Sequence, residues 1–436
     1  MEMDRHPLAY LRWQRHWSMD DLARLLRAQA GALGLRSGID RNRIWRWEHG
    51  TTPDADSQLL LARLLDVPAT VIAQLRWPLW LPVFEQPAAF SPSGSRAALR
   101  EVQVNRMDRR SFLVFSSSAL VDLAANWARI EPSHLCHALD GRGIDTELLN
   151  WLEQRAGELN AMACGPGSPV PALIDAHLHT AIELIAQDRC TLPQQRRLHA
   201  VTAALAHRAG WLRFDADRHA DAQRHWQAAV HAAHQAGDRD LAAVALSDLA
   251  YQATWLARPS DALRVLEHAS SRTRTPAVRS LLDVRRARAC AVLKDRSGTT
   301  HALASAQNEL EHMRPESTPA VVSWMSVADV NADAGRCWLD LGDPNSAGTA
   351  IGTGLVELDP RRARTKAVFL TYRAEGALHR HDAAAAAADA RTALDTALDT
   401  GAARCIDHVS ALIARLDKRS ERPIVELREY AHARLA

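Results

Sequence analysis

Apolar residues recur at helical spacing through most of the chain, and this pattern predicts a protein built from helices. Near the amino end such segments begin at Pro7, at Met19 and at Leu59. Ser18 and Asp21 form a Ser-x-x-Asp capping pattern at the start of the second segment. With a further segment over residues 39–50 and a short one through Val71, Ile72 and Leu75, they predict a bundle of five short helices.

Residues 39–50 are the most informative segment of this bundle. Asp40 is a favourable N-cap, Ile44 and Trp47 lie at i,i+3 as a buried pair, and Gly50 permits the left-handed conformation that ends a helix. The outward face then carries Arg41, Asn42, Arg43 and Arg46. Arginine pairs with guanine O6 and N7, and asparagine with adenine N6 and N7, so this face suits reading of the DNA major groove. The alternative is an ordinary solvated, arginine-rich helix face.

The flanking sequence resembles the Cro/cI-like, XRE-type helix-turn-helix regulators over Arg12 to Leu26, Ile44 to Pro53 and Leu59 to Val67. The string Arg46-Trp47-Glu48-His49-Gly50, followed by Pro53, is the most recognisable motif of that family. The resemblance implies that Trp47 and Glu48 are structural. It implies contacts to double-stranded DNA from Arg36, Arg41, Asn42, Arg43, Trp45 and Arg46. The chain departs from the family between Leu26 and Asp40, where a short turn is usual, so either the second helix is longer or the loop near the phosphates is enlarged.

Composition favours an all-α fold of two or three helical units. The chain has 436 residues, of which 47% are apolar and only 5% aromatic, as in Ala- and Leu-rich helices. Stretches rich in Trp, Pro, Ser and Gly separate the units. We expect a five-helix DNA-binding domain over residues 1–82, a linker over 83–110, a helical connector over 111–171 and a repeat domain over 172–436. The net charge is only +2, so affinity for DNA must come from local clusters of arginine.

A repeated pattern of small residues occupies the last of these units. It places a small residue in one helix, an Ala twelve positions later and another small or apolar residue four positions further on. Five sets fit, and they are Gly210, Ala222 and Trp226; Ala250, Ala262 and Leu266; Cys290, Ala302 and Ala306; Gly335, Ala347 and Ile351; and Ala374, Ala386 and Ala390. The pattern resembles tetratricopeptide (TPR) repeats, which implies helix pairs stacked into a solenoid with a concave wall. The alternative is a generic Ala-rich bundle.

The resemblance to helix-turn-helix proteins with such repeats extends to the peptide receptors called the RRNPP group. This implies an effector on the concave wall, and aromatic, polar and charged side chains together suit a peptide. The candidate ligand-binding residues are His207, Trp211, Phe214, Ser247, Tyr251, Thr254, Asp329, Arg336, Thr371 and Glu375. Each aromatic residue among them is equally compatible with an ordinary core position.

Other chemistry finds little support in the sequence. The pairs His134 and His137, His177 and His179, and His231 and His234 lack further ligands and are expected to be ordinary helix histidines, not a metal site. No hydrolase, phosphate-binding or metalloprotease motif occurs, so we expect neither an enzyme nor a cofactor. Residues 107–115 mimic a twin-arginine export signal, but we expect an internal helix capped by Asp108. Six dispersed cysteines and the lack of a long apolar run favour a cytoplasmic protein without a membrane span.

These features predict an all-α, homodimeric transcription regulator. Its repeat domain binds a peptide, small-molecule or protein effector and changes the spacing of two DNA-reading domains. The alternative is a TPR-type interaction scaffold or an anti-activator, in which the helix-turn-helix module does not bind DNA.

Overall fold

The computed structural model describes residues 6–34, 37–65, 67, 72, 77–78, 80–81, 84–85, 87–103, 114–115, 117–130, 146–162, 168–187, 190–416 and 419–435. Over these residues the fold is all-α, as predicted, apart from one parallel pairing of two-residue strands, β1 (Phe84–Glu85) with β2 (Val114–Phe115). No helix in this part of the chain has both the length and the hydropathy needed to cross a bilayer.

The first four helices form a small unit with its own core. They are α1 (Pro7–Gln14), α2 (Met19–Ala32), α3 (Arg41–Glu48) and α4 (Ala55–Leu64). The predicted capping box of Ser18 and Asp21 is present, and Asp54 caps α4 through the amide of Ser57. The apolar faces of these helices meet around Leu22, Ile44 and Leu61. Of the predicted fifth helix only Ile72 is described, and it is helical, whereas Val71 and Leu75 lie outside the described residues.

The segment between Leu26 and Asp40 is partly helix. Helix α2 continues to Ala32, so of the two alternatives the longer second helix is present. Arg27 donates from Nη1 to the carbonyl of Ile39 at 2.9 Å, and Ile39 is buried in the core, which fixes the chain just before α3. Arg36 lies outside the described residues.

Six elements connect this unit to the paired helices that follow: β1, α6 (Pro92–Gln103), β2, α7 (Ser117–Arg129), α8 (Thr146–Ala161) and α9 (Val170–Ala186). Within the segment expected to be a linker, residues 92–103 form α6, which buries Ala98 and Leu99 and packs on α11 and α9. Turn-forming residues in 91–95 start this helix, but its apolar residues keep it folded against the neighbouring helices. Asp108 lies outside the described residues. Of the helix expected after it, Val114 and Phe115 form strand β2 instead, so the expectation is wrong at these two residues, whose backbone pairs with β1.

Five helix pairs follow, each packed most closely within itself. The pairs are α10 (Leu192–Asp215) with α11 (His219–Ala236), α12 (Arg239–Trp255) with α13 (Pro259–Ser270), α14 (Pro276–Val292) with α15 (Arg296–Glu311), α16 (Val327–Asp340) with α17 (Pro344–Glu357), and α18 (Ala363–His379) with α19 (Ala383–Thr400). Two turns of 3₁₀ helix, η2 (Pro315–Ser317) and η3 (Ala320–Val322), precede α16, and α20 (Ala403–Ala414) and α21 (Arg422–Leu435) complete the chain.

The small residues lie where the two helices of a pair cross. All fifteen residues of the five predicted sets are buried. A Cβ on Gly210 would come within 2.4 Å of Trp226 Nε1, and a Cβ on Gly335 within 2.3 Å of Ile351 Cγ1. Because these approaches leave no room for a side chain at Gly210 and Gly335, glycine at these two positions follows from close helix packing.

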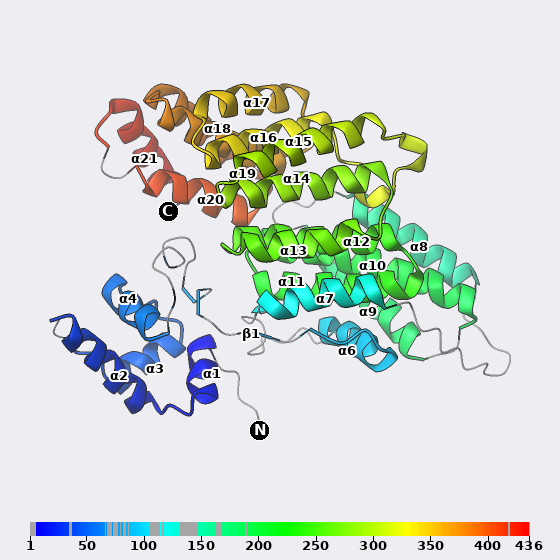
Figure 1. Cartoon of the computed structure of the whole chain (residues 1–436), viewed down its shortest axis with the longest axis horizontal. Coiled ribbons are helices and arrows are strands. Elements are labelled where there is room, and N and C mark those ends of the chain that lie inside the picture. The colour runs from blue at the N-terminus through cyan, green and yellow to red at the C-terminus, as the bar shows by residue number, and fades with distance from the viewer. Residues whose placement is uncertain are drawn as a thin grey trace.

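Two contacts connect parts of the molecule that are distant in sequence. Asp215, at the end of α10, accepts hydrogen bonds from Arg404 of α20 at 3.0 Å and from Arg364 of α18 at 3.2 Å. The first and last helix pairs are thereby tied together. Leu256, which ends α12, is buried in the same core as Trp80 and Leu81 of the N-terminal unit. Figure 1 shows that unit beside the paired helices, with β1 between them.

Candidate functional site

Helix α3 is held in place by its ends and by its buried face. The Asp40 carboxylate accepts from the Arg43 amide at 2.8 Å, as predicted for an N-cap. At the other end Gly50 adopts φ +98°, and the Thr51 amide bonds the Arg46 carbonyl at 3.0 Å, which is a Schellman ending. Ile44 and Trp47 are buried, as predicted. The orientation of the outward face is therefore determined by local contacts on three sides.

An ion pair between α1 and α3 adds a fourth constraint. Arg12 donates from Nε to Glu48 Oε1 at 2.7 Å and from Nη2 to Oε2 at 3.2 Å, while its Nη1 bonds the Trp17 carbonyl at 2.8 Å. The Glu48 side chain is only 4% exposed. A two-pronged contact of this kind fixes the relative orientation of the helices as well as their distance. In this structure Glu48 and Trp47 therefore hold α3 in place.

The outward face of α3 carries the candidate DNA contacts. Arg41, Asn42 and Arg46 are exposed, and Arg43 is half-buried beside Asp54, with 3.3 Å between Nη2 and Oδ2. Trp45 is 50% exposed and stacks on the His49 ring, with centroids 4.0 Å apart. Five of the six predicted residues thus share one short helix, and only Arg36 lies outside the described residues.

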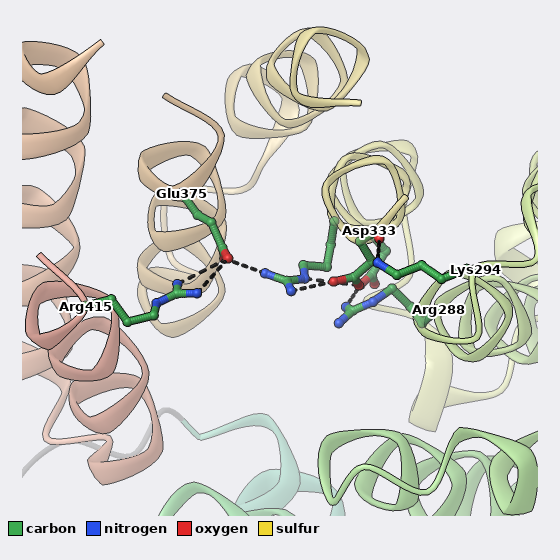
Figure 2. Close-up of polar contacts among 7 residues, drawn as sticks. Arg288, Lys294, Asp333, Glu375 and Arg415 are labelled. Carbon is green, nitrogen blue, oxygen red and sulfur yellow. Dashed lines mark hydrogen bonds and ion pairs between the residues drawn. The ribbon is translucent and has the colours of Figure 1, made fainter. Parts of the chain in front are cut away.

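A second polar cluster lies on the face formed by the first helices of the pairs. We call it the arginine cluster; it consists of Arg285, Arg288, Arg336, Arg364, Arg404 and Arg415. Figure 2 shows its central part: Arg336 bonds Glu375 at 2.6 Å and Asp340, Arg415 bonds the same Glu375 at 3.1 Å, and Arg288 bonds Asp333 at 2.6 Å. Lys294 donates to the Asp340 carbonyl beside them. These contacts connect α14, α16, α18 and α20.

Two predicted ligand residues, Arg336 and Glu375, belong to this network. Burial alone would raise the pKa of Glu375, but the charges of Arg336 and Arg415 outweigh burial and lower that pKa to about 2. Nearby, burial and then the charge of Arg336 lower the pKa of His408 to about 3. At neutral pH the cluster therefore contains an ionised glutamate and an uncharged histidine.

Three predicted residues, Trp211, Phe214 and Tyr251, form an aromatic group with Trp226 and Trp255. Phe214 is fully buried inside it, and Tyr251 is 8% exposed. His207 and Trp211 both bond the buried carboxylate of Asp248, at 2.7 and 2.8 Å. Within this group Tyr251 has the shortest approach to the arginine cluster among the described residues, because the Arg285 guanidinium lies 4.0 Å from the centre of its ring.

The remaining predicted ligand residues have local partners. Ser247, Thr254 and Thr371 bond carbonyls of their own helices. Asp329 completes the capping box that starts α16 and accepts from both terminal nitrogens of Arg362, at 2.8 and 2.7 Å. Among the described residues, the hydrogen bonds of these four side chains go to partners other than the six arginines of the cluster.

Sequence reasoning missed the residues that surround Tyr251. Arg285 and Arg288 lie on α14, and Arg404 lies on α20, where its guanidinium is 4.8 Å from the Phe214 ring centre and 5.4 Å from that of Trp255. A signal was present on α14, since arginines at positions 285, 286 and 288 interrupt the apolar residues of its second half. For Arg404 no local signal existed, because its partners lie 189 residues away.

The chain matches no protein-family model, and no curated protein is similar to it.

Proposed function

We propose that this protein is a sequence-specific DNA-binding transcription regulator of the XRE type, with α2 and α3 as its helix-turn-helix and the helix pairs as a TPR-like sensor domain. The observation that carries the proposal is the outward face of α3. Arg41, Asn42, Arg43 and Arg46 project from a short helix whose position is fixed by two caps, two core residues and the Arg12–Glu48 pair. Base reading requires donors held in one orientation, and this support provides it.

The contact between the two parts of the chain supports a sensory role for the helix pairs. Leu256 lies at the end of α12 and shares a core with Trp80 and Leu81. The adjacent Trp255 contacts Arg404 and His408 of α20. A ligand that moves this end of α12 would change the position of the N-terminal unit relative to the helix pairs. In a homodimer, such a change alters the spacing of two recognition helices and hence the affinity for paired half-sites.

The direct test selects duplexes from a random-sequence library with the full-length protein and then compares variants by gel shift at fixed salt. Arg46→Ala should relax the preference for at least one base pair, because a bidentate arginine contributes about 1–3 kcal/mol of discrimination. If the Arg41 side chain contacts phosphate, Arg41→Ala should lower the affinity equally for all sequences. It should also reduce the slope of log affinity against log salt concentration by about 1.

Arg422→Ala is the matched control, because that arginine is 90% exposed on α21 and pairs only with Glu426 on its own helix among the described residues. It should leave affinity and preference unchanged. Absence of any selected sequence with the wild-type protein, or the same sequence preference in wild type and in variants at positions 41, 42, 43 and 46, would contradict the proposal.

A second candidate is a protein-binding module, either a scaffold or an anti-activator. The observation that favours it is the exposure of two large apolar side chains on the N-terminal unit, Trp13 at 59% and Trp45 at 50%. Tryptophan is a common anchor of protein interfaces. A stable complex with one protein that is lost in Trp45→Ala, together with no selection of DNA, would support this function instead.

A further inference from the structure

The arginine cluster has more positive than negative charge. Five of its six arginines contact carboxylates, and they share four of them, those of Asp215, Asp333, Asp340 and Glu375. A further carboxylate nearby, that of Asp248, already accepts from His207 and Trp211. Arg415 is 59% exposed, so solvent screens its charge, whereas excess charge on the more buried arginines is costly unless a counter-charge is bound. The imbalance therefore calls for an anion from outside the chain.

Arg285 is the arginine without a carboxylate among the described residues. It is 7% exposed, its guanidinium lies over the Tyr251 ring, and its Nε is buried without a hydrogen-bond partner in that part of the chain. A buried, charged donor of this kind is rarely left unsatisfied in a folded protein. Its place on α14, in the middle of the cluster, indicates where the missing negative charge belongs.

Two other arginines bring unused donors to the same region. Arg288 Nε and Arg404 Nη1 are also buried and have no partner within the described residues, although both arginines hold a carboxylate through other nitrogens. Both lie near the ring that Arg285 covers: Arg288 follows Arg285 by three residues on α14, and the Arg404 guanidinium is 4.8 Å from the Phe214 ring, whose centroid is 5.8 Å from that of Tyr251. Tyr251 is thus the common neighbour of three guanidinium groups from α14 and α20, and its hydroxyl has no hydrogen-bond partner among the described residues.

We propose that Arg285, Arg288 and Arg404 bind a small anion with two negative charges, of the phosphoryl or dicarboxylate class, beside the Tyr251 hydroxyl. Forked guanidinium donors and a neutral hydroxyl donor are the groups that suit such oxygens. The proposal deepens the sensory role above and rests on it only for its regulatory meaning. Arg285 and Arg288 lie on α14 and Arg404 lies on α20, so the anion would connect these two helices.

Binding is tested with the full-length protein, by calorimetry and by thermal unfolding in sodium phosphate and in sodium succinate, each against sodium chloride of equal ionic strength. We expect saturable binding with a Kd below about 1 mM for at least one anion. Saturation by phosphate alone assigns a phosphoryl ligand, and saturation by succinate alone assigns a dicarboxylate. Saturation by both supports a site for anions with two negative charges that does not distinguish the two classes. Absence of saturable binding to either anion overturns the proposal.

Variants locate the site. Arg285→Gln should weaken binding by at least about ten-fold and Tyr251→Phe by about three-fold, the latter because only the hydroxyl is removed. Arg286→Gln is the matched control: it is the next residue on α14, but its side chain bonds Asp283 and Ser270. Arg285→Lys, which keeps the charge, covers the case in which Arg285→Gln fails to fold, and it should retain part of the affinity. Equal affinities in the variants at 285 and 286 would refute the site.

The same samples separate this proposal from the proposed function. Gel shifts with and without the anion report DNA binding independently. Saturable anion binding by a protein that selects no DNA would contradict the regulator but retain the site, whereas DNA selection without anion binding would do the reverse.

Discussion

At the scale of single residues, the Arg12–Glu48 pair makes the clearest prediction. Glu48 is almost fully buried, so Glu48→Ala would leave a guanidinium facing a poorly solvated space. We expect a loss of about 3 kcal/mol in the stability of the N-terminal unit, since breaking one side of a buried pair costs more than the pair contributes. Urea unfolding of the full chain, followed by tryptophan fluorescence, measures this. Under the proposed function, DNA binding should weaken in parallel because α3 loses its support.

The matched comparison is the exposed pair of Arg24 with Asp21 on α2, whose side chains are 70% and 38% exposed. Arg24→Ala should cost below about 1 kcal/mol, because solvent already screens that contact. Similar losses for the two variants would mean that Glu48 is not buried as described.

At the scale of elements, the crossing of paired helices predicts the effect of a single methyl group. Gly210→Ala would place its Cβ 2.4 Å from Trp226 Nε1, so α10 and α11 must separate or Trp226 must move. We expect a loss of about 1–3 kcal/mol in thermal or urea unfolding, as for other overpacked cores. Trp226→Leu in the Gly210→Ala background should recover part of the loss, because it removes the ring that clashes.

Gly157→Ala is the control for helix propensity. Gly157 lies within α8, and an added Cβ would meet nothing within 4 Å. Replacing a helical glycine by alanine in open space stabilises by up to about 1 kcal/mol. Opposite signs for the two variants are therefore expected, and equal stabilisation by both would show that α10 and α11 do not approach so closely.

The sequence could predict what depends on neighbours along the chain. The cap of Asp40, the buried pair Ile44 and Trp47, and the small residues at Gly210 and Gly335 all follow from helical periodicity and local sterics. It could not predict the arginine cluster, because Arg404 meets Asp215 only after five helix pairs have stacked. For the same reason the sequence alone leaves Phe214 compatible with an open wall or with the core, and the stacked helices bury it completely. The packing of helices that are distant in sequence, not the pattern within one helix, decides which side of a residue is covered.

At the scale of the whole molecule, the burial of Leu256 indicates how the N-terminal unit contacts the helix pairs. Leu256 and Leu293 occupy the same position at the ends of α12 and α14, each followed by a residue with positive φ, Ala257 and Lys294. Leu256 is 5% exposed and Leu293 is 45% exposed. Since both belong to equivalent turns, the difference arises from the N-terminal unit, which covers Leu256 with Trp80 and Leu81.

Leu256→Asp should therefore release the N-terminal unit without unfolding either part, because a carboxylate cannot remain in that apolar contact. Small-angle scattering should report a larger radius of gyration than in wild type, with unchanged helical circular dichroism. Under the proposed regulation, the DNA affinity of this variant should no longer respond to an effector that binds the helix pairs. The reason is that α12 would have lost its contact with the N-terminal unit. Leu293→Asp introduces the same charge at the equivalent exposed turn and should behave as wild type in all three measurements. An unchanged radius of gyration in Leu256→Asp would mean that other contacts hold the two parts together.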